Sequence, residues 1–376
     1  YYYSDVDHPM TTLYRNSGTP NYMTSHLKTS TQGLKLKNNF ALDGYKVLVG
    51  LDGSIRTWDG NYYKNDILHV VPKSINDAET KNAALFTTID KQFGKFALKL
   101  GARYDMTDIT NANAAQQDNS YNALNANIFT SYTIDTQNKV FIGFGQASRV
   151  PDARELYFVS SMGTTVGTPN LDQTTNREVD LGYEFSNDLT KVKVKTFYSD
   201  LKDYIYIKQG VATNAFSNID AKVYGGEISS ETFVSDDMTL EASLAYKRGK
   251  KDQALAGQTN TNLADIAPLQ ARLGATYEYA KNSAVSAEVL ASDAWDTYDA
   301  DNGEQKLAGW ATLNLKAKHA FSKTVELTVG VNNVFDTTYA TSNTYTDLTL
   351  LLGGTEQVML LNDPGRYLYT NLTYKF

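Results

Sequence analysis

The C-terminal segment alternates polar and apolar side chains up to the final residue of the chain. Counting back in twos from Phe376 gives Tyr374, Leu372, Thr370 and Leu368, so an extended strand here has one apolar face that ends in aromatic side chains. A frayed terminus in water is more often polar. A strand that must stay paired to its last residue indicates a closed barrel, which has no open edge, and its apolar face predicts contact with lipid.

The same period of two recurs through the chain. Apolar side chains fall on one face and charged side chains on the other in the segments 96–105, 178–185 and 324–332. A helix would distribute these residues around all of its sides, so the pattern favours strands.

Short and long connections alternate between these segments. Short polar turns are expected at Asp43-Gly44, 91–94, 135–138, 186–188, Asp236-Asp237, Lys281-Asn282 and Ser322-Lys323. Long polar loops are expected at 9–30, 59–77, 108–120, 150–175, 209–214, 251–265, 296–306 and 337–364. This alternation, with turns at one end and loops at the other, is the topology of outer-membrane barrels. We therefore predict an all-β fold, a transmembrane antiparallel β-barrel with about sixteen strands present.

Composition supports a barrel and excludes several other classes. The chain has 26 Tyr and 15 Phe, which suit aromatic girdles at the membrane interfaces, yet its mean hydropathy is only −0.41. No stretch approaches the roughly 18 apolar residues that a membrane helix needs. The absence of Cys excludes a disulfide framework and thiolate ligands within this chain. A net charge of −7 argues against a nucleic-acid partner.

Four segments, in the right order, resemble the TonB-dependent outer-membrane receptor family. They are a strand that ends in Arg149-Val-Pro151 followed by Glu155-Leu-Tyr157, the segment 170–184, the Asn332-Asn-Val-Phe-Asp336 segment with Tyr339, and Pro364-Gly-Arg366 with the terminal strand. In the second segment, Asp172-Gln-Thr departs from the family's usual Lys-Pro-Glu. The resemblance covers about the C-terminal two thirds of the chain.

The resemblance implies a barrel of about 22 strands with a plugged lumen, embedded in the outer membrane of a Gram-negative cell. It also implies energy supply by the TonB complex through the plug domain, and a metal or metal-chelate substrate. No plug or energy-coupling box is visible, no signal peptide is recognised, and the chain opens on Tyr1. Residues 1–376 are therefore expected to be a barrel portion that lacks the plug and about six first strands. A complete passive porin of about sixteen strands is the main alternative, and a soluble or structural β-protein is a more distant one.

No enzyme site or organic cofactor site is evident in the sequence. The histidines His8, His26, His69 and His319 show no nucleophile arrangement. The carboxylates lie at alternate positions, which is typical of the wall of a water-filled lumen.

One motif, Asp7-His8-Pro9-Met10, predicts metal binding at the start of the first long loop. Imidazole and thioether two residues apart can reach one soft ion, and this pair suits copper, particularly Cu(I). The copper-receptor branch of the family combines a barrel-loop His-x-Met with a Cys-x-x-x-Met of the plug, and the segment 56–60 also resembles that branch. The resemblance thus implies that His8 and Met10 are ligands of a transported copper ion. Met23 and His26, in the same loop, are auxiliary candidates.

Other loop residues have two interpretations. Met162 and Met359 could guide a soft metal inward, but we interpret them as flexible fillers of loop contacts. Aromatic loop residues hold the chelate in an iron–siderophore receptor, which is the alternative function, whereas Trp and Tyr in any barrel anchor it at the membrane interface. Interface anchoring is the interpretation we favour for Tyr14, Trp58, Trp295, Tyr298 and Tyr345.

Overall fold

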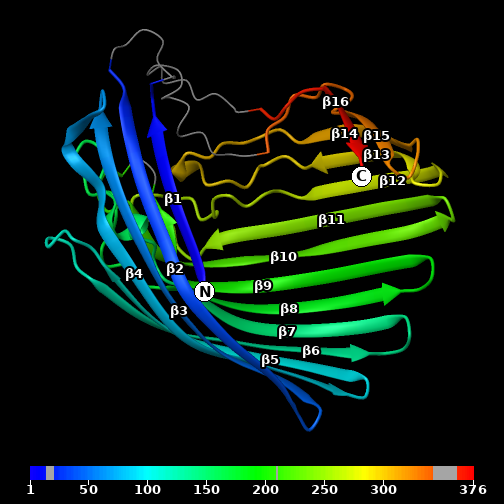
Figure 1. The fold of residues 1–376 in the computed structure, drawn as a ribbon, viewed down its shortest axis with the longest axis horizontal. Helices are drawn as coiled ribbons and strands as arrows, with labels where there is room; N and C mark the ends of the chain where they lie inside the picture. Colours follow the sequence, from blue (N-terminus) through cyan, green and yellow to red (C-terminus); the bar gives the residue numbers. More distant parts are fainter. Residues whose placement is uncertain (14–20, 209–210, 342–361) are drawn as a thin grey trace.

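The strands form one antiparallel sheet in chain order, from β1 to β16, which curves strongly along its width (Figure 1). The computed structural model describes residues 1–13, 21–208, 211–341 and 362–376. Each strand pairs with its sequence neighbours, and among the described residues β1 and β16 do not pair with each other, so the sheet is open. The prediction of about sixteen antiparallel strands is confirmed.

The sixteen strands are β1 (Tyr2–Thr11), β2 (Met23–Leu42), β3 (Tyr45–Lys64), β4 (Ile67–Phe93), β5 (Phe96–Thr110), β6 (Asn119–Thr133), β7 (Asn138–Arg149), β8 (Thr174–Ser186), β9 (Thr190–Ile207), β10 (Phe216–Ser235), β11 (Met238–Lys251), β12 (Gln270–Ala280), β13 (Ser283–Ser292), β14 (Trp310–Ala320), β15 (Val325–Asn332) and β16 (Tyr367–Tyr374). Two short helices, α1 (Ala153–Tyr157) and the 3₁₀ helix η1 (Ala300–Asn302), lie in connections. Among the described residues, neither these nor any other helix has the length and apolar character to cross a membrane.

The short turns lie where the sequence predicts them, at the end of the sheet that we call the turn end. Asp43 and Gly44 join β2 to β3 with φ angles of 48° and 74°, as a two-residue turn with both centres left-handed requires. Longer connections gather at the other end, the loop end (Figure 1).

Two of the predicted long loops differ from the structure. The region 59–77 is mostly strand: β3 and β4 meet at a tight turn in which Asn65 and Asp66 have φ angles of 51° and 64°. The bounds of the loop predicted at 9–30 are too wide, because residues 9–11 and 23–30 are the paired ends of β1 and β2. At the start of β4, Ile67, Leu68, Val70 and Val71 place apolar side chains on both faces, and the β1–β2 end is largely polar. Neither pair therefore shows the apolar–polar alternation that identifies a strand.

The outer face of the sheet is apolar and exposed. Leu36, Leu51, Leu85 and Tyr104 lie directly opposite one another across β2 to β5, and are 56%, 55%, 60% and 44% exposed. Residues directly opposite in antiparallel strands share a face, so this row is continuous. Such a row would be unstable in water and suits lipid.

The inner face is polar and ion-paired. Arg103 of β5 contacts Asp52 of β3 (Nη1–Oδ2 3.2 Å) and Asp105 (Nη2–Oδ1 2.8 Å), and Lys35 of β2 contacts the same Asp52 carboxylate at 3.0 Å. These groups are only partly buried, as expected for a wetted wall. This arrangement agrees with the prediction that alternating carboxylates line a water-filled lumen.

Aromatic rings cover glycines across neighbouring strands of the inner face. A Cβ atom on Gly182 would lie 1.9 Å from the Phe141 ring, and Gly50 is covered in the same way by Phe86. The glycines allow large rings to lie flat against the wall, which smooths the inner surface.

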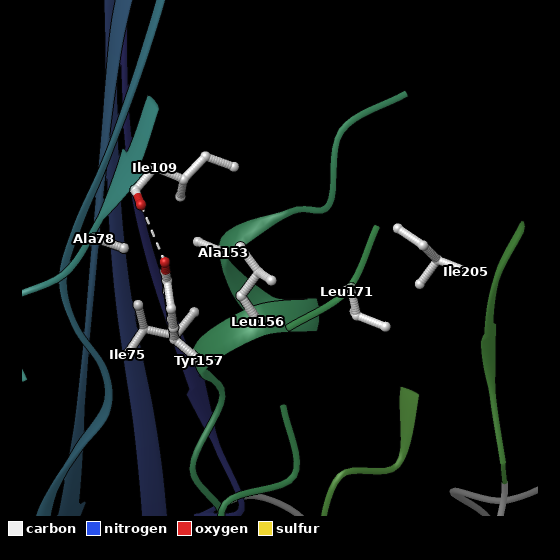
Figure 2. Close-up of a cluster of buried hydrophobic side chains, with 8 residues drawn as sticks. All are labelled: Ile75, Ala78, Ile109, Ala153, Leu156, Tyr157, Leu171 and Ile205. Atoms are coloured by element: carbon white, nitrogen blue, oxygen red, sulfur yellow. Dashed lines mark hydrogen bonds between the residues drawn. The ribbon is translucent and has the colours of Figure 1, made fainter. Parts of the chain in front are cut away.

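The β7–β8 connection folds back onto the inner face and carries α1. The helix begins at a capping box in which the Asp152 side chain accepts from the Arg154 N–H and the Glu155 side chain accepts from the Asp152 N–H at 2.7 Å. Figure 2 shows Leu156 and Tyr157 of α1 against Ile75 and Ile109 of the wall, with the Tyr157 hydroxyl donating to the Ile109 carbonyl at 3.1 Å. This cluster fixes one loop inside the curve of the sheet.

Candidate functional site

His8 and Met10 lie in strand β1, near its loop end, rather than in a loop as the sequence predicts. His8 is opposite Leu27 of β2 and Met10 is opposite Ser25. Backbone pairing therefore fixes both residues, and successive alternate positions in a strand lie about 7 Å apart on one face. Both side chains are exposed, Met10 by 44%.

The register places both residues on the inner face. Leu27 is opposite Gly60 of β3, and a Cβ atom on Gly60 would lie 2.7 Å from the Leu27 side chain. Gly60 shares its face with Trp58, which packs against the cluster around α1. His8 and Met10, opposite residues of the same face, thus point toward the side of the sheet that the β7–β8 connection occupies.

The two auxiliary candidates are separated by the sheet. Met23 lies two residues from Ser25 on β2, so it shares the inner face and is a diagonal neighbour of Met10. His26 is opposite Pro9 and faces outward, where its ring contacts the Asp7 carboxylate. The grouping of His26 with His8 and Met10 is therefore not supported, because an ion on the inner face would lie beyond its reach.

Trp58 does not anchor the sheet at a membrane interface. It lies on the inner face of β3 and packs against the buried cluster of Figure 2. The Arg56 guanidinium stands 4.8 Å from its ring centroid and forms an ion pair with Asp152 at 2.9 Å. The interface interpretation is wrong here because a folded loop, rather than lipid, covers the ring.

The same correction applies to two aromatic residues of the β13–β14 connection. Trp295 is 6% exposed and packs with Leu307 and Ala340, with Tyr298 against them. Met162 is 86% exposed and packs against no buried cluster, so the filler interpretation does not describe it. Tyr14, Tyr345 and Met359 lie outside the described residues.

A buried polar network at the loop end was not predicted from the sequence. The Lys251 ammonium contacts Asp299 Oδ2 at 2.6 Å, and both side chains are fully buried. The Tyr206 hydroxyl and the Asn302 amide donate to the same oxygen, each at 2.6 Å. The network joins β9, β11 and the β13–β14 connection. Its partners are far apart in sequence, so no local pattern signals it.

Another carboxylate of this connection, that of Glu304, links it to the β11–β12 connection. Its two oxygens accept from the backbone N–H groups of Asp299 at 2.6 Å and Asp265 at 2.8 Å. Burial raises the pKa of the Glu304 carboxyl above its usual range. Next to it, the exposed Asp301 carboxylate accepts from the N–H groups of Thr259 and Asn260, and these hydrogen bonds lower its pKa.

Within the described parts of the chain, no group of three or more His, Cys, Asp or Glu side chains is arranged to hold a metal ion. His8 and Met10 belong to a different class of site, because a thioether supplies one ligand. Both side chains are exposed on the inner face, so the question of a metal site there rests on their ligand chemistry.

A curved sheet of long antiparallel strands, apolar outside and polar inside, with turns at one end and loops at the other, defines an outer-membrane β-barrel. Residues 1–334 match the family model "TonB dependent receptor-like, beta-barrel", and the chain belongs to this family. Barrels of this family lie in the outer membrane of Gram-negative cells, and the family comprises transporters rather than enzymes. The loop end of the sheet is therefore extracellular.

Several solved structures share this fold. "Copper transporter OprC" matches with a TM-score of 0.85 and 20% identity over 100% of this chain and 61% of that one. The ferric citrate transporter FecA in its unliganded form matches with a TM-score of 0.76 and 14% identity over 100% and 58%. The FrpB iron transporter from Neisseria meningitidis (F5-1 variant, apoprotein) matches with a TM-score of 0.73 and 13% identity over 95% and 61%.

The chain thus spans about three fifths of the length of these solved structures. Comparison with curated protein sequences gave no match. Because these identities are low, the structural likeness establishes the fold and leaves the substrate to the chemistry of the site.

Proposed function

We propose that this chain is the barrel portion of a TonB-dependent outer-membrane receptor that imports copper, and that His8 and Met10 bind the transported ion. The observation that carries the proposal is the common inner face of these two residues, fixed by the register of β1 with β2. An exposed His and an exposed Met, two positions apart, present an imidazole nitrogen and a thioether sulfur toward the lumen side.

The ligand chemistry favours copper over the other metals that such receptors could carry. Thioether ligands select soft ions such as Cu(I), whereas Mg²⁺, Ca²⁺ and ferric ions prefer oxygen ligands. Met23 on the same face adds a second thioether at a diagonal position. One of the solved structures that share the fold is a copper transporter by its title, which supports the same substrate.

The transport mechanism follows from a barrel whose lumen is filled by a plug. Copper would bind at the extracellular rim of β1 and β2, with the remaining ligands supplied from the plug that faces this wall. The TonB complex would then act on the plug from the inner-membrane side and release the ion through the barrel. In this scheme the chain supplies the outer-membrane wall and half of the metal site.

The test is the copper content of the purified full-length receptor, measured by elemental analysis after loading with Cu(I) and desalting. The double substitution His8→Ala with Met10→Ala is expected to remove tightly bound copper without changing barrel assembly. Met23→Ala is expected to weaken binding less, because it removes one thioether and leaves the His–Met pair. Unchanged stoichiometry in the double variant would overturn the proposal.

An iron–siderophore receptor is the second candidate, since two of the solved structures described above are iron transporters by their titles. The Arg56–Trp58 pair on the inner face is the feature that favours it, because a cation beside an aromatic ring suits an anionic chelate. However, Arg56 is already paired with Asp152 and Trp58 is packed under α1. Growth on copper or on ferric chelates as the limiting metal source separates the two functions.

The passive porin is not supported. The family model identifies a TonB-dependent receptor barrel, and among the described residues β1 and β16 do not close the sheet by pairing.

A further inference from the structure

The outer face of β8 to β11 carries a row of charged residues near the extracellular end. Arg177, Asp200, Lys222 and Lys250 lie directly opposite one another across these four neighbouring strands (Figure 1). Residues paired in this way share a face, and the row spans about 14 Å at the usual strand spacing. On β8, Arg177 alternates with the exposed apolar residues Val179 and Leu181 and therefore lies on the same face, so the row faces outward.

The row lies at the level where the outer face passes from apolar to polar. The next row toward the turn end contains Tyr198 and Tyr224, which are 45% and 38% exposed and stack with their ring centroids 6.4 Å apart. Exposed tyrosines on the outside of a barrel mark the membrane interface. The charged row is about 7 Å further toward the extracellular side, which is the depth of the lipid headgroups.

Of the five cations named in this region, two form ion pairs with carboxylates and three do not. Lys222 forms an ion pair with Asp252 at 2.9 Å. Lys202, which follows Asp200 by two residues on β9 toward the loop end, forms an ion pair with Asp220 at 2.6 Å. By contrast, Arg177 donates to the neutral Gln146 amide at 3.0 Å, and Arg248, beside Tyr224, donates to the neutral Asn262 amide at 2.7 Å. These two and the exposed Lys250 contact no carboxylate among the described residues.

The outer rim elsewhere has a different character. On β1 to β5 the outer rim carries the carboxylates of Asp7, Asp59, Glu79 and Asp108. Three lysines there form ion pairs with them: Lys28 with Asp7, Lys73 with Asp59 and Lys81 with Glu79. On β12 to β14 the outward row nearest the loop end is Ala271, Ala291 and Ala311, which lie opposite one another and carry no charge. Among the described residues, the β8–β11 sector thus differs from the β1–β5 rim in carrying several cations without a carboxylate partner.

We propose that the outer face of β8 to β11 binds the phosphate groups of the phosphorylated glycolipid that forms the outer leaflet of the outer membrane. Arg177, Arg248 and Lys250 supply charge-assisted hydrogen bonds to phosphate oxygens, and the planar guanidinium groups can donate two bonds to one phosphate. Tyr198 and Tyr224, just below, receive the upper part of the acyl chains. The partner is a membrane lipid rather than a free anion, because the cations stand directly above an apolar, lipid-facing wall.

The test compares lipid binding by two triple variants of the full-length receptor in detergent, measured by native mass spectrometry. The first variant carries Arg177→Gln, Arg248→Gln and Lys250→Gln. The matched control carries Lys28→Gln, Lys73→Gln and Lys81→Gln, which removes the same charge from paired positions of the same rim. The probes are bis-phosphorylated lipid A, its dephosphorylated form and inorganic phosphate.

The first variant is expected to bind bis-phosphorylated lipid A roughly tenfold or more weakly than the wild type, and the control to change by less than about threefold. Wild-type binding should weaken with added salt and should be lost with dephosphorylated lipid A. Equal losses in the two variants, or equal binding of dephosphorylated lipid, would overturn the proposal. Displacement of lipid A by inorganic phosphate at equal concentration would replace it with a free-anion site.

A heat-induced mobility shift in gel electrophoresis verifies that each variant is folded. If the first triple variant does not fold, Lys250→Gln alone is compared with Lys28→Gln alone, since both side chains are exposed. A smaller loss confined to Lys250→Gln supports the proposal, and no difference between the two contradicts it.

Discussion

The extracellular side of the molecule contains two polar regions that are built in opposite ways. The β1–β2 end presents His8 and Met10 as exposed side chains whose positions depend on strand register alone. The junction of β9, β11 and the β13–β14 connection buries Lys251 and Asp299 completely and holds them with short hydrogen bonds. The first region is thus set by backbone pairing and leaves its side chains exposed, whereas the second is closed by side-chain contacts.

The largest effect is expected from a substitution that disrupts the buried Lys251–Asp299 network. Asp299→Ala leaves the Lys251 ammonium buried without a partner, which typically costs about 3–5 kcal/mol. The β11–β12 and β13–β14 connections should become sensitive to limited proteolysis while the strands stay intact. The control is Lys306→Ala, which removes an exposed ion pair with Asp296 in the same connection and should leave protease resistance close to that of the wild type. Equal protease resistance of wild type and Asp299→Ala would contradict the account.

A smaller effect is expected from acid. Because hydrogen bonds from Thr259 and Asn260 lower the pKa of Asp301 in the folded protein, its contribution to stability is present above the unfolded-state pKa. It is lost as pH falls through the lower, folded-state value. Glu304 acts with the opposite sign: its pKa is raised by burial, so its contribution is complete below the unfolded-state pKa and declines as pH rises through the folded-state value.

The measurement is hydrogen exchange of the Thr259 and Asn260 amides, corrected for the intrinsic rate, from about pH 6 down to well below about 3.9, where an unperturbed Asp titrates. Protection should fall toward the acid end in the wild type. In Asp301→Asn the acid-dependent loss should disappear, whereas Glu304→Gln should retain it. Acid-independent protection in the wild type would show that Asp301 does not hold this junction.

The smallest effect is expected on the outer face of the β1–β2 end. His26→Ala removes the contact with the exposed Asp7 carboxylate, so the melting temperature should stay close to that of the wild type. Copper binding should be unchanged, because His26 faces away from His8 and Met10. A thermal melt and copper analysis of this variant test the assignment of faces directly. Copper loss equal to that of the His8→Ala, Met10→Ala variant would mean that the faces are assigned incorrectly.

Most of the fold follows from the period of two and the turn residues. The outward row through Leu36 and Leu51 and the turn at Asp43-Gly44 are predictable because one face is apolar and the turn chemistry is specific. The hairpin at Asn65-Asp66 was missed although both residue types favour left-handed conformations. The β4 segment after the turn has apolar side chains at adjacent positions (Ile67-Leu68 and Val70-Val71), so the alternation that identifies a half-buried strand is absent.

The site was predictable only in part. His8 and Met10 are recognisable from ligand chemistry, but the separation of His26 from them depends on the register of β1 with β2, which the sequence pattern of either strand does not give. The burial of Trp58 depends on the α1 connection, which lies about a hundred residues further along the chain. The pairing of Lys251 with Asp299 is likewise a tertiary contact, and two isolated charged residues in polar loops carry no signal of it.

The central claim is that His8 and Met10 bind transported copper together on the inner face. X-ray absorption at the copper edge of the Cu(I)-loaded full-length receptor tests it most directly. We expect a first shell that contains both nitrogen and sulfur scatterers, with the nitrogen contribution lost in His8→Ala, the sulfur contribution reduced in Met10→Ala, and no change in His26→Ala. A first shell that is identical in the wild type and in the His8→Ala and Met10→Ala variants would contradict the claim.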